Sequence, residues 1–186
     1  MTAVDEDIIA LIEEHPEIFE RYKVELLRGE IVMMSAPGKV HNMNVLFVQR
    51  QIPSDRWYPL QTQDIAIPGE ASEPVPDLVV VGPEEIEESS RIIPAPAVTL
   101  VMEVVSKSSV YRDYSLKSSI YAAGQVPAYL IVDPIKSSCL LLTEPTGAGD
   151  EASYLYQRTC KFGDPLHIEV LDLTLDTSML RSLPST

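Results

Sequence analysis

A single carboxylate, Glu103, lies in the middle of an apolar segment that runs from Val98 to Ser106. The segment is short and rich in β-branched residues, so it predicts a strand buried inside a sheet. An unpaired carboxylate is costly to bury, so a cation, a hydrogen-bond network or a raised pKa must accompany it. The fold therefore has to supply at least one of these three at Glu103.

A second carboxylate, Asp77, opens the apolar run 78–81, which also predicts a short buried strand. Side chains alternate along a strand, so Glu103 shares a face with Val101 and Val105. If the two strands are neighbours, Asp77 and Glu103 can converge on one cation. Carboxylate oxygens completed by water are the ligands that Mg²⁺ prefers, and Mn²⁺ accepts the same set. We therefore expect a magnesium or manganese site at Asp77 and Glu103.

A lysine follows on the next predicted element, a helix over 113–123. Asp113, Lys117 and Tyr121 are spaced four residues apart and share one face of that helix. An ammonium beside a metal-bound water can orient the water and offset charge that develops on a phosphoryl group. We expect this role for Lys117.

Each of these residues also has a purely structural interpretation. Asp77 follows a proline and fits a turn or cap position. Glu103 fits a buried ion pair with a lysine or arginine. Asp113 and Lys117 fit an exposed pair that contributes only ~0.3–0.5 kcal/mol.

Three further residues have structural interpretations that the sequence favours. His41 lies on an apolar helix face, where a histidine satisfied inside the core is the commoner case. Glu25 and Glu30 lie in a predicted hairpin, where solvated strand residues are the commoner case.

The order of predicted elements indicates an α/β domain. Helices are predicted at 4–14, 41–52 and 113–123, the last ended by Gly124. Strands are predicted in a hairpin over 24–34 that turns at Arg28-Gly29, and at 60–67, 77–81, 98–106, 128–132, 139–143, 154–159 and 168–173. The central order of helix, three strands, helix and strand predicts a mixed sheet, with extra β-strands at both ends. We expect one domain over 1–186, with a core at about 20–135 and a C-terminal β extension at 136–186.

The composition of the chain restricts the kinds of molecule that it can bind. The 186 residues carry a net charge of −14, so the overall field repels polyanions, and a nucleic-acid function needs a local basic patch, metal ions or both. No apolar run approaches the ~20 residues of a membrane helix, and the acidic N-terminus does not resemble a signal peptide, so we expect a cytoplasmic protein without a membrane partner. Cys139 and Cys160 lack the spacing of zinc ligands and are expected to be small core or half-exposed residues.

Taken together, the motifs resemble a known pattern. They are ELLRGE at 25–30, His41, PDLVV at 76–80, EVVS at 103–106, Asp113, Lys117, YAAG at 121–124 and YLIVDP at 129–134. The set resembles the PD-(D/E)XK nuclease superfamily and, within it, the Uma-two family, whose bacterial members are usually labelled restriction endonucleases. Val105 stands at the usual lysine position, and Lys117 is similar to the migrated lysine that this superfamily shows.

The resemblance implies a restriction-endonuclease-like fold and a Mg²⁺-dependent endonuclease that hydrolyses phosphodiester bonds in DNA. It implies metal ligation by Asp77, Glu103 and the carbonyl of Val104, and water activation by Lys117. His41 and Glu30 would complete the site, and Asp113 and Tyr121 would support it from behind. Local charge adds substrate binding: Lys107, Arg112 and Lys117 form a basic stretch with only Asp113 against them, and we expect Lys107 and Arg112 to face a phosphate. A homodimer is also expected, since the many strands leave sheet edges to cover.

Two other functions stay open. A nuclease fold with weak or no catalysis can act as an interaction or regulatory module, which the charge of −14 favours. A hydrolase of a small phosphoester would need a closed pocket. The segment 124–130, GQVPAYL, also departs from the family form Gly-Val-Pro-Glu-Tyr-Trp, which alters packing and leaves the proposed ligands intact.

Overall fold

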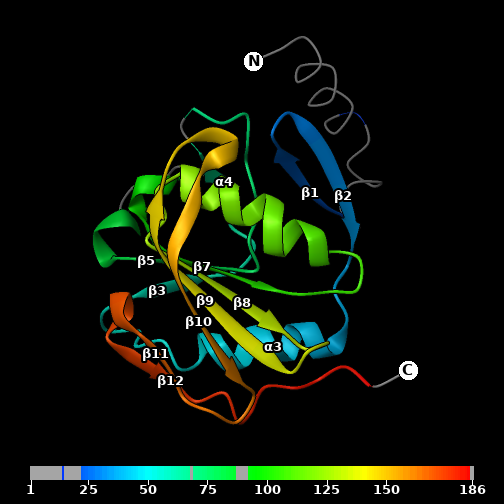
Figure 1. Cartoon of the computed structure of the whole chain (residues 1–186), viewed down its shortest axis with the longest axis vertical. Coiled ribbons are helices and arrows are strands. Elements are labelled where there is room, and N and C mark those ends of the chain that lie inside the picture. The colour runs from blue at the N-terminus through cyan, green and yellow to red at the C-terminus, as the bar shows by residue number, and fades with distance from the viewer. Residues whose placement is uncertain (1–13, 15–21, 68, 87–91, 185–186) are drawn as a thin grey trace.

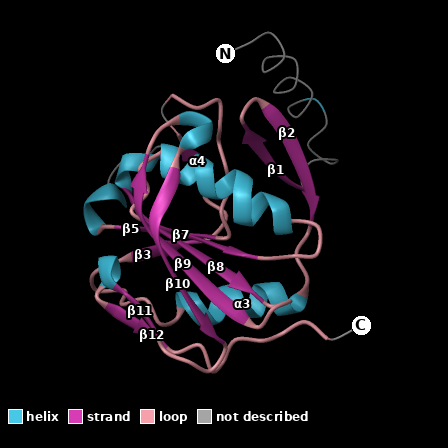
Figure 2. Cartoon of the chain, viewed as in Figure 1, coloured by secondary structure: helices cyan, strands magenta, loops and turns pink. Residues whose placement is uncertain are grey.

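The computed structural model describes residue 14 and the ranges 22–67, 69–86 and 92–184. Apart from its last position, the helix predicted at 4–14 lies outside these residues. The architecture is a mixed central sheet with helices on both faces, as the sequence predicts (Figures 1 and 2).

The central sheet has six strands in the order β10-β9-β8-β7-β5-β3. Their bounds are β3 Tyr58–Leu60, β5 Leu78–Val81, β7 Val98–Val104, β8 Ala128–Asp133, β9 Ser138–Thr146 and β10 Ser153–Lys161. Strands β7 and β8 pair in parallel, and the other neighbours pair antiparallel. The parallel pair needs a crossover, which the helical segment 112–123 supplies.

Helix α3 (Lys39–Gln49) and helix α4 (Lys117–Ala123) cover opposite faces of this sheet (Figure 1). Each face has its own apolar core, because the strands between them alternate their side chains. Val45 and Val48 of α3 pack with Leu100 and Met102, whereas Ile120 of α4 packs on the other face. Within the described ranges, no helix has the length and apolar character that crossing a membrane requires.

A separate hairpin lies beside α4 and consists of β1 (Tyr22–Leu27) and β2 (Glu30–Ser35). Its turn is the predicted Arg28-Gly29, with φ angles of 51° and 78°. Two left-handed residues in a two-residue turn match the twist of the paired strands. The Arg28 guanidinium then binds Glu70, Ser119, Asp150 and the carbonyl of Gly149, so it joins the hairpin to α4 and to the β9–β10 turn.

Two predicted strands are interrupted in the structure. The segment 60–67 contains the end of β3 and then β4 (Ile65–Ala66), because Thr62 has a φ of 50° and turns the chain. Strand β4 pairs in parallel with β6 (Ile93–Pro94). The segment 168–173 spans the turn between β11 (Leu166–Ile168) and β12 (Leu173–Leu175), where Asp172 adopts a left-handed conformation. Short 3₁₀ turns occupy Pro83–Ile86, Ala95–Ala97, Gly149–Glu151 and Glu169–Leu171.

The helix predicted at 113–123 is also divided. Its first part, Arg112–Leu116, is a π-helix, and α4 begins only at Lys117. The N–H of Lys117 donates to the carbonyl of Arg112, five residues back, which closes the wider turn. Such a π turn changes the direction of the residues that follow it and is frequent at functional sites.

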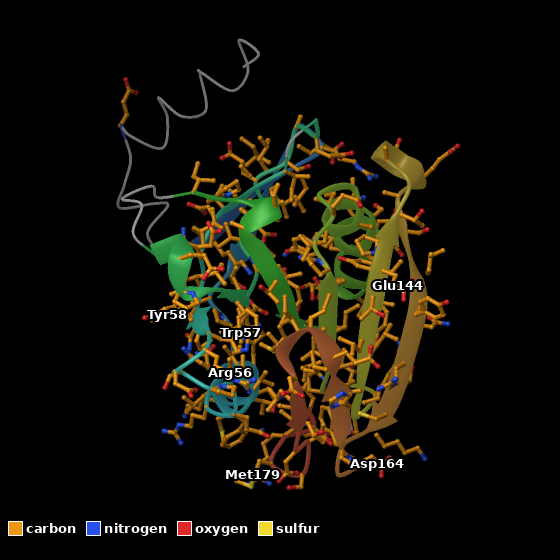
Figure 3. The ribbon with its side chains drawn as sticks, turned by 90° about the vertical axis from the view of Figure 1, so that its left-hand side faces the viewer. Arg56, Trp57, Tyr58, Glu144, Asp164 and Met179 are labelled. Carbon is orange, nitrogen blue, oxygen red and sulfur yellow. The ribbon has the colours of Figure 1, made fainter. Side chains whose placement is uncertain are left out.

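The residues after 136 contribute two strands to the central sheet and a separate two-stranded hairpin. Strands β9 and β10 extend the central sheet beyond β8, and β11 and β12 pack on its α3 face. Cys139 is buried and Cys160 is half-buried on facing positions of β9 and β10, as the sequence predicts. Figure 3 shows the two sides of the molecule, with Tyr58 of the edge strand β3 on one side and Glu144 of β9 on the other.

Gly124 ends α4 as predicted, but for a packing reason. Its φ of −72° is ordinary. A Cβ there would lie 2.9 Å from Ile67 Cδ1 and 3.1 Å from Ala95 Cβ, both buried, so any larger residue forces these neighbours to shift.

We expect Gly124→Ala to lower the free energy of unfolding by roughly 1–3 kcal/mol through overpacking. Urea unfolding followed by circular dichroism measures it. Gly38→Ala is the matched control, because a Cβ at Gly38 meets no atom within 4 Å and its φ of −77° suits alanine. Equal stability of the two variants would contradict the packing role.

Candidate functional site

Glu103 lies in the penultimate position of β7 and faces α4, on the side of the sheet that the alternation predicts. Strands β5 and β7 are antiparallel neighbours, and Leu78 faces Met102. One residue further along this register, Asp77 lies beside Glu103. The predicted adjacency of the two carboxylates is therefore present.

Glu103 is bound by two donors from α4. The Lys117 ammonium donates to Glu103 Oε1 at 2.6 Å, and the Tyr121 hydroxyl donates to the same oxygen at 2.8 Å. Glu103 is 3% exposed and Lys117 is 1% exposed. The structural alternative for Glu103, a buried ion pair with a lysine, is thus what the structure shows. Its second oxygen, Oε2, stays outside this contact.

Glu25 of β1 joins the pair, and the expectation that it is solvated is wrong. It is 1% exposed, and its Oε1 accepts from Lys117 Nζ at 2.7 Å and from the backbone N–H of Val75 at 2.9 Å. Its Oε2 is buried without a hydrogen-bond partner among the described residues. The hairpin thus contributes a third carboxylate, which shares one ammonium with Glu103.

Lys23 brings a second ammonium from the same strand. Its Nζ is within 4.0 Å of three carboxylate oxygens, Asp77 Oδ1 at 3.0 Å, Glu25 Oε1 at 3.7 Å and Glu103 Oε2 at 3.8 Å. The Lys23 side chain retains 19% of its exposure, so it is the more accessible of the two cations. It lies at the point where the three carboxylates converge.

The other oxygen of Asp77 is fixed by the fold. Asp77 Oδ2 accepts from the N–H of Val104 at 2.8 Å and lies 2.8 Å from His41 Nε2. Asp77 thus connects β5 to β7 and to α3, beyond what a turn or cap residue does. His41 in turn has a carboxylate partner, so it is more than a core histidine.

Burial and charge act against each other on these groups. Burial raises the pKa of Glu103 above its usual value, with the charges of Lys117 and Lys23 opposing it. For Asp77 burial acts in the same direction, but Lys23 and His41 prevail and hold its pKa well below the usual range. Burial lowers the pKa of Lys23, Lys117 and His41, yet the nearby carboxylates leave all three raised. The cluster therefore retains its cations.

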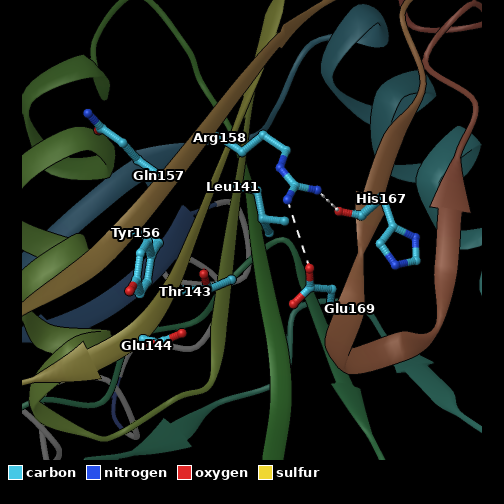
Figure 4. A pocket seen from close by; sticks show the side chains of 8 residues that line it. All are labelled: Leu141, Thr143, Glu144, Tyr156, Gln157, Arg158, His167 and Glu169. Atoms are coloured by element: carbon cyan, nitrogen blue, oxygen red, sulfur yellow. Dashed lines mark hydrogen bonds and ion pairs between the residues drawn. The ribbon is translucent and has the colours of Figure 1, made fainter.

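These groups lie on the wall of a cavity of about 760 Å³. Its lining includes five lysines and arginines and three acidic residues, namely Lys23, Lys39, Lys107, Arg112, Lys117, Asp77, Glu103 and Asp113. In a chain with a net charge of −14, this is a local basic surface. A second hollow, of about 270 Å³, lies over β9 and β10, where Arg158 pairs with Glu169 (Figure 4).

Lys107 and Arg112, the predicted substrate-binding residues, both line the larger cavity, Lys107 exposed and Arg112 half-buried. Lys117 lines the same cavity, but it is buried and paired, so it belongs to the carboxylate cluster and not to the basic stretch.

Asp113 and Glu30 do not make the contacts with the site that were expected of them. The Asp113 carboxylate accepts from the Ser109 hydroxyl and its carbonyl accepts from Tyr129, while Lys117 binds Glu25 and Glu103 instead. The alternative of an exposed pair between Asp113 and Lys117 is therefore not what the structure shows, because both side chains are buried and Lys117 pairs with Glu25 and Glu103. Glu30 is exposed at the hairpin turn and does not line the cavity.

Sequence analysis did not identify Lys23 and Glu25 as site residues. On β1, Val24 and Leu26 form the obvious apolar face, which predicts that Lys23 and Glu25 point to solvent. The structure inverts this, because Leu27 shares the face of Glu25 and is buried in the core. In the sequence of this strand, Leu27 is the apolar residue that indicates burial of the face that carries Lys23 and Glu25.

In the described part of the chain, no three histidine, cysteine, aspartate or glutamate side chains form a ready-made metal-binding group. The ammonium groups of Lys23 and Lys117 stand among the carboxylates and hold them.

Comparison with known proteins agrees with this architecture. The family Uma2, described as "Putative restriction endonuclease", matches residues 10–178. The chain belongs to the Uma2 family. A crystal structure of a "putative nuclease belonging to DUF820" from Anabaena variabilis ATCC 29413 is similar with a TM-score of 0.67 at 13% identity, covering 84% of this chain and 88% of that one. The fold is thus restriction-endonuclease-like. No curated protein matches the chain.

The buried ion pair gives a first test of the site. We expect Lys117→Met to lower the free energy of unfolding by roughly 3–5 kcal/mol, because it leaves Glu25 and Glu103 buried without their shared cation. Urea unfolding measures the loss. Lys39→Met is the control, since Lys39 is an exposed lysine on the same cavity and should change stability by under about 0.5 kcal/mol. A loss below about 1 kcal/mol in Lys117→Met would contradict the shared-cation role.

Proposed function

We propose that this protein is a Mg²⁺- or Mn²⁺-dependent endonuclease that hydrolyses phosphodiester bonds in DNA. One observation carries the proposal: Glu25, Asp77 and Glu103 converge around one ammonium at the wall of a basic cavity. Burying three carboxylates close together costs free energy of folding, which indicates that a function retains them. Membership in the Uma2 family supports the same assignment.

The residues present fit a divalent cation. The oxygens that point to the convergence, Asp77 Oδ1 and Glu103 Oε2, are not held by backbone donors, and buried Glu25 Oε2 has no hydrogen-bond partner among the described residues. Asp77, Glu103 and the carbonyl of Val104 would hold the ion, with Glu25 beside them. When bound, it would polarise a phosphoryl oxygen and lower the pKa of a bound water.

The remaining groups position these ligands. An ammonium has three donors, and Lys117 uses two of them on Glu25 and Glu103, which leaves one N–H for the attacking water or the phosphate. Tyr121 fixes Glu103 through its hydroxyl. His41 fixes Asp77 at the oxygen opposite the convergence, and so acts as a positioning residue.

Basic residues that line the cavity can attract a polyanion locally, although the net charge of the whole chain repels one. Lys107 and Arg112 line the same cavity as Asp77 and Glu103. Lysine and arginine contacts to phosphate supply most of the sequence-independent affinity for DNA. We assign substrate binding to these two residues.

Nicking of supercoiled plasmid in Mg²⁺ or Mn²⁺ tests the proposal. We expect activity in the native chain, and a loss of roughly a hundredfold or more in Asp77→Asn and Glu103→Gln, since each removes a charged metal ligand worth several kcal/mol. Glu85→Gln is the charge-matched control, because Glu85 is exposed and does not line the cavity. Undiminished nicking by Asp77→Asn and Glu103→Gln would reject this site.

Binding of a DNA duplex in Ca²⁺, measured by fluorescence anisotropy at several salt concentrations, tests the phosphate contacts. We expect Lys107→Ala to weaken binding and to reduce the salt slope by about 1, the value for one lost phosphate contact. The exposed Lys136, which lies over the Tyr114 ring and outside the cavity lining, gives the control Lys136→Ala. An unchanged slope in Lys107→Ala would remove Lys107 from the interface.

A second candidate function has one observation in its favour. Lys23 and Lys117 already neutralise part of the carboxylate cluster, which a non-catalytic interaction module would also need. Calorimetry separates the two, since such a module would not bind Mg²⁺. Cleavage of bis(p-nitrophenyl) phosphate without plasmid nicking would instead assign the site to a small phosphoester. The homodimer, the single domain and the cytoplasmic location stay predictions.

A further inference from the structure

Two ammonium groups serve the carboxylate cluster, and they are held differently. Lys117 is 1% exposed and makes two short contacts, at 2.6 and 2.7 Å. Lys23 makes one contact at 3.0 Å and two at 3.7 and 3.8 Å, and its side chain is 19% exposed. Lys117 is therefore held by two short contacts, whereas Lys23 is hydrogen-bonded to Asp77 alone and only ion-paired with the other two carboxylates.

The oxygens divide between the two cations in the same way. Glu103 Oε1 is taken by Lys117 and Tyr121, and Asp77 Oδ2 by the N–H of Val104 and by His41. The opposite oxygens, Glu103 Oε2 and Asp77 Oδ1, face Lys23, which is the cation that lies within 4.0 Å of both among the described residues. Lys23 thus occupies the side of the carboxylates that the fold leaves free.

Formal charge shows why this matters for a divalent ion. Three carboxylates and two ammonium groups leave the cluster with a single negative charge. A dication added to that set would make it positive and would lie beside the Lys23 ammonium, which repels it. Without Lys23, the same dication would neutralise the cluster.

We propose that the Lys23 ammonium occupies the position of the divalent cation in the metal-free protein, and that it must withdraw into the adjoining cavity for the metal to bind. Lys23 lines that cavity of about 760 Å³, and its flexible four-carbon stem allows the movement without a change in β1. Lys23 therefore sets the metal affinity of the site. This inference rests on the proposed function.

Calorimetric titration of the DNA-free protein with MgCl₂, repeated with MnCl₂, tests the competition. We expect Lys23→Met to bind the ion about tenfold tighter or more than the native chain, because an ammonium that occupies the position roughly nine-tenths of the time leaves only about one-tenth of the molecules competent to bind. Lys23→Arg, which retains the charge, should bind no tighter than the native chain. Lys39→Met is the control, as an exposed lysine on the same cavity wall, and should bind as the native chain does.

Thermal unfolding gives a second measurement that involves no catalysis. Without metal, Lys23→Met should melt below the native chain, because its three carboxylates lose a cation. Saturating Mg²⁺ should then raise its melting temperature by more than it raises that of the native chain. A variant that binds metal tightly has folded, so the titration and the melt check one another.

The outcomes separate the two proposals. If the native chain binds metal and Lys23→Met binds it equally or more weakly, the competition is wrong and the nuclease proposal stands. If Lys23→Arg gains as much affinity as Lys23→Met, charge is not the cause and the inference also fails. If neither the native chain nor any variant binds a divalent ion, the proposed function itself fails.

Discussion

The buried ammonium of Lys117, held between Glu25 and Glu103, is the interaction on which the rest of this structure depends. It joins three elements at one buried point: the hairpin β1–β2, the central strand β7 and the helix α4. Two buried carboxylates would be prohibitive alone, and a lysine in that position would be equally costly without them. Each charge is tolerable only because the others are present, so the hairpin must dock for the sheet to retain Glu103.

The central strands were predictable, because their apolar runs are short and rich in β-branched residues, and the juxtaposition of Asp77 with Glu103 followed once the two strands were taken as neighbours. The position of Lys117 on the following helix, on the side of the carboxylates, was expected too. The π turn over Arg112–Leu116 leaves no trace in residue spacing, and neither does the direct pairing of Lys117 with Glu25 and Glu103.

The hairpin was predicted in its extent and misjudged in its faces. A strand that alternates Val24 and Leu26 with Lys23 and Glu25 gives its charged side to solvent in an isolated sheet. Here the charged side turns inward because Leu27 packs in the core and because the segment before Asp77 pairs with β1 through Leu26 and Glu73. Tertiary contacts determine that choice, so the alternation of β1 alone did not identify the third carboxylate.

Glu25 and Lys117 lie 92 positions apart in the sequence, which limits when the carboxylate cluster can form during synthesis. Glu25 leaves the ribosome long before the lysine that will share its charge, and Asp77 and Glu103 follow in between. Contacts of such long range form late in folding. A chain that ends before Lys117 therefore carries Glu25, Asp77 and Glu103 without the buried cation that joins two of them, so the charged groups can meet only after the hairpin, the strands and the crossover have all been synthesised.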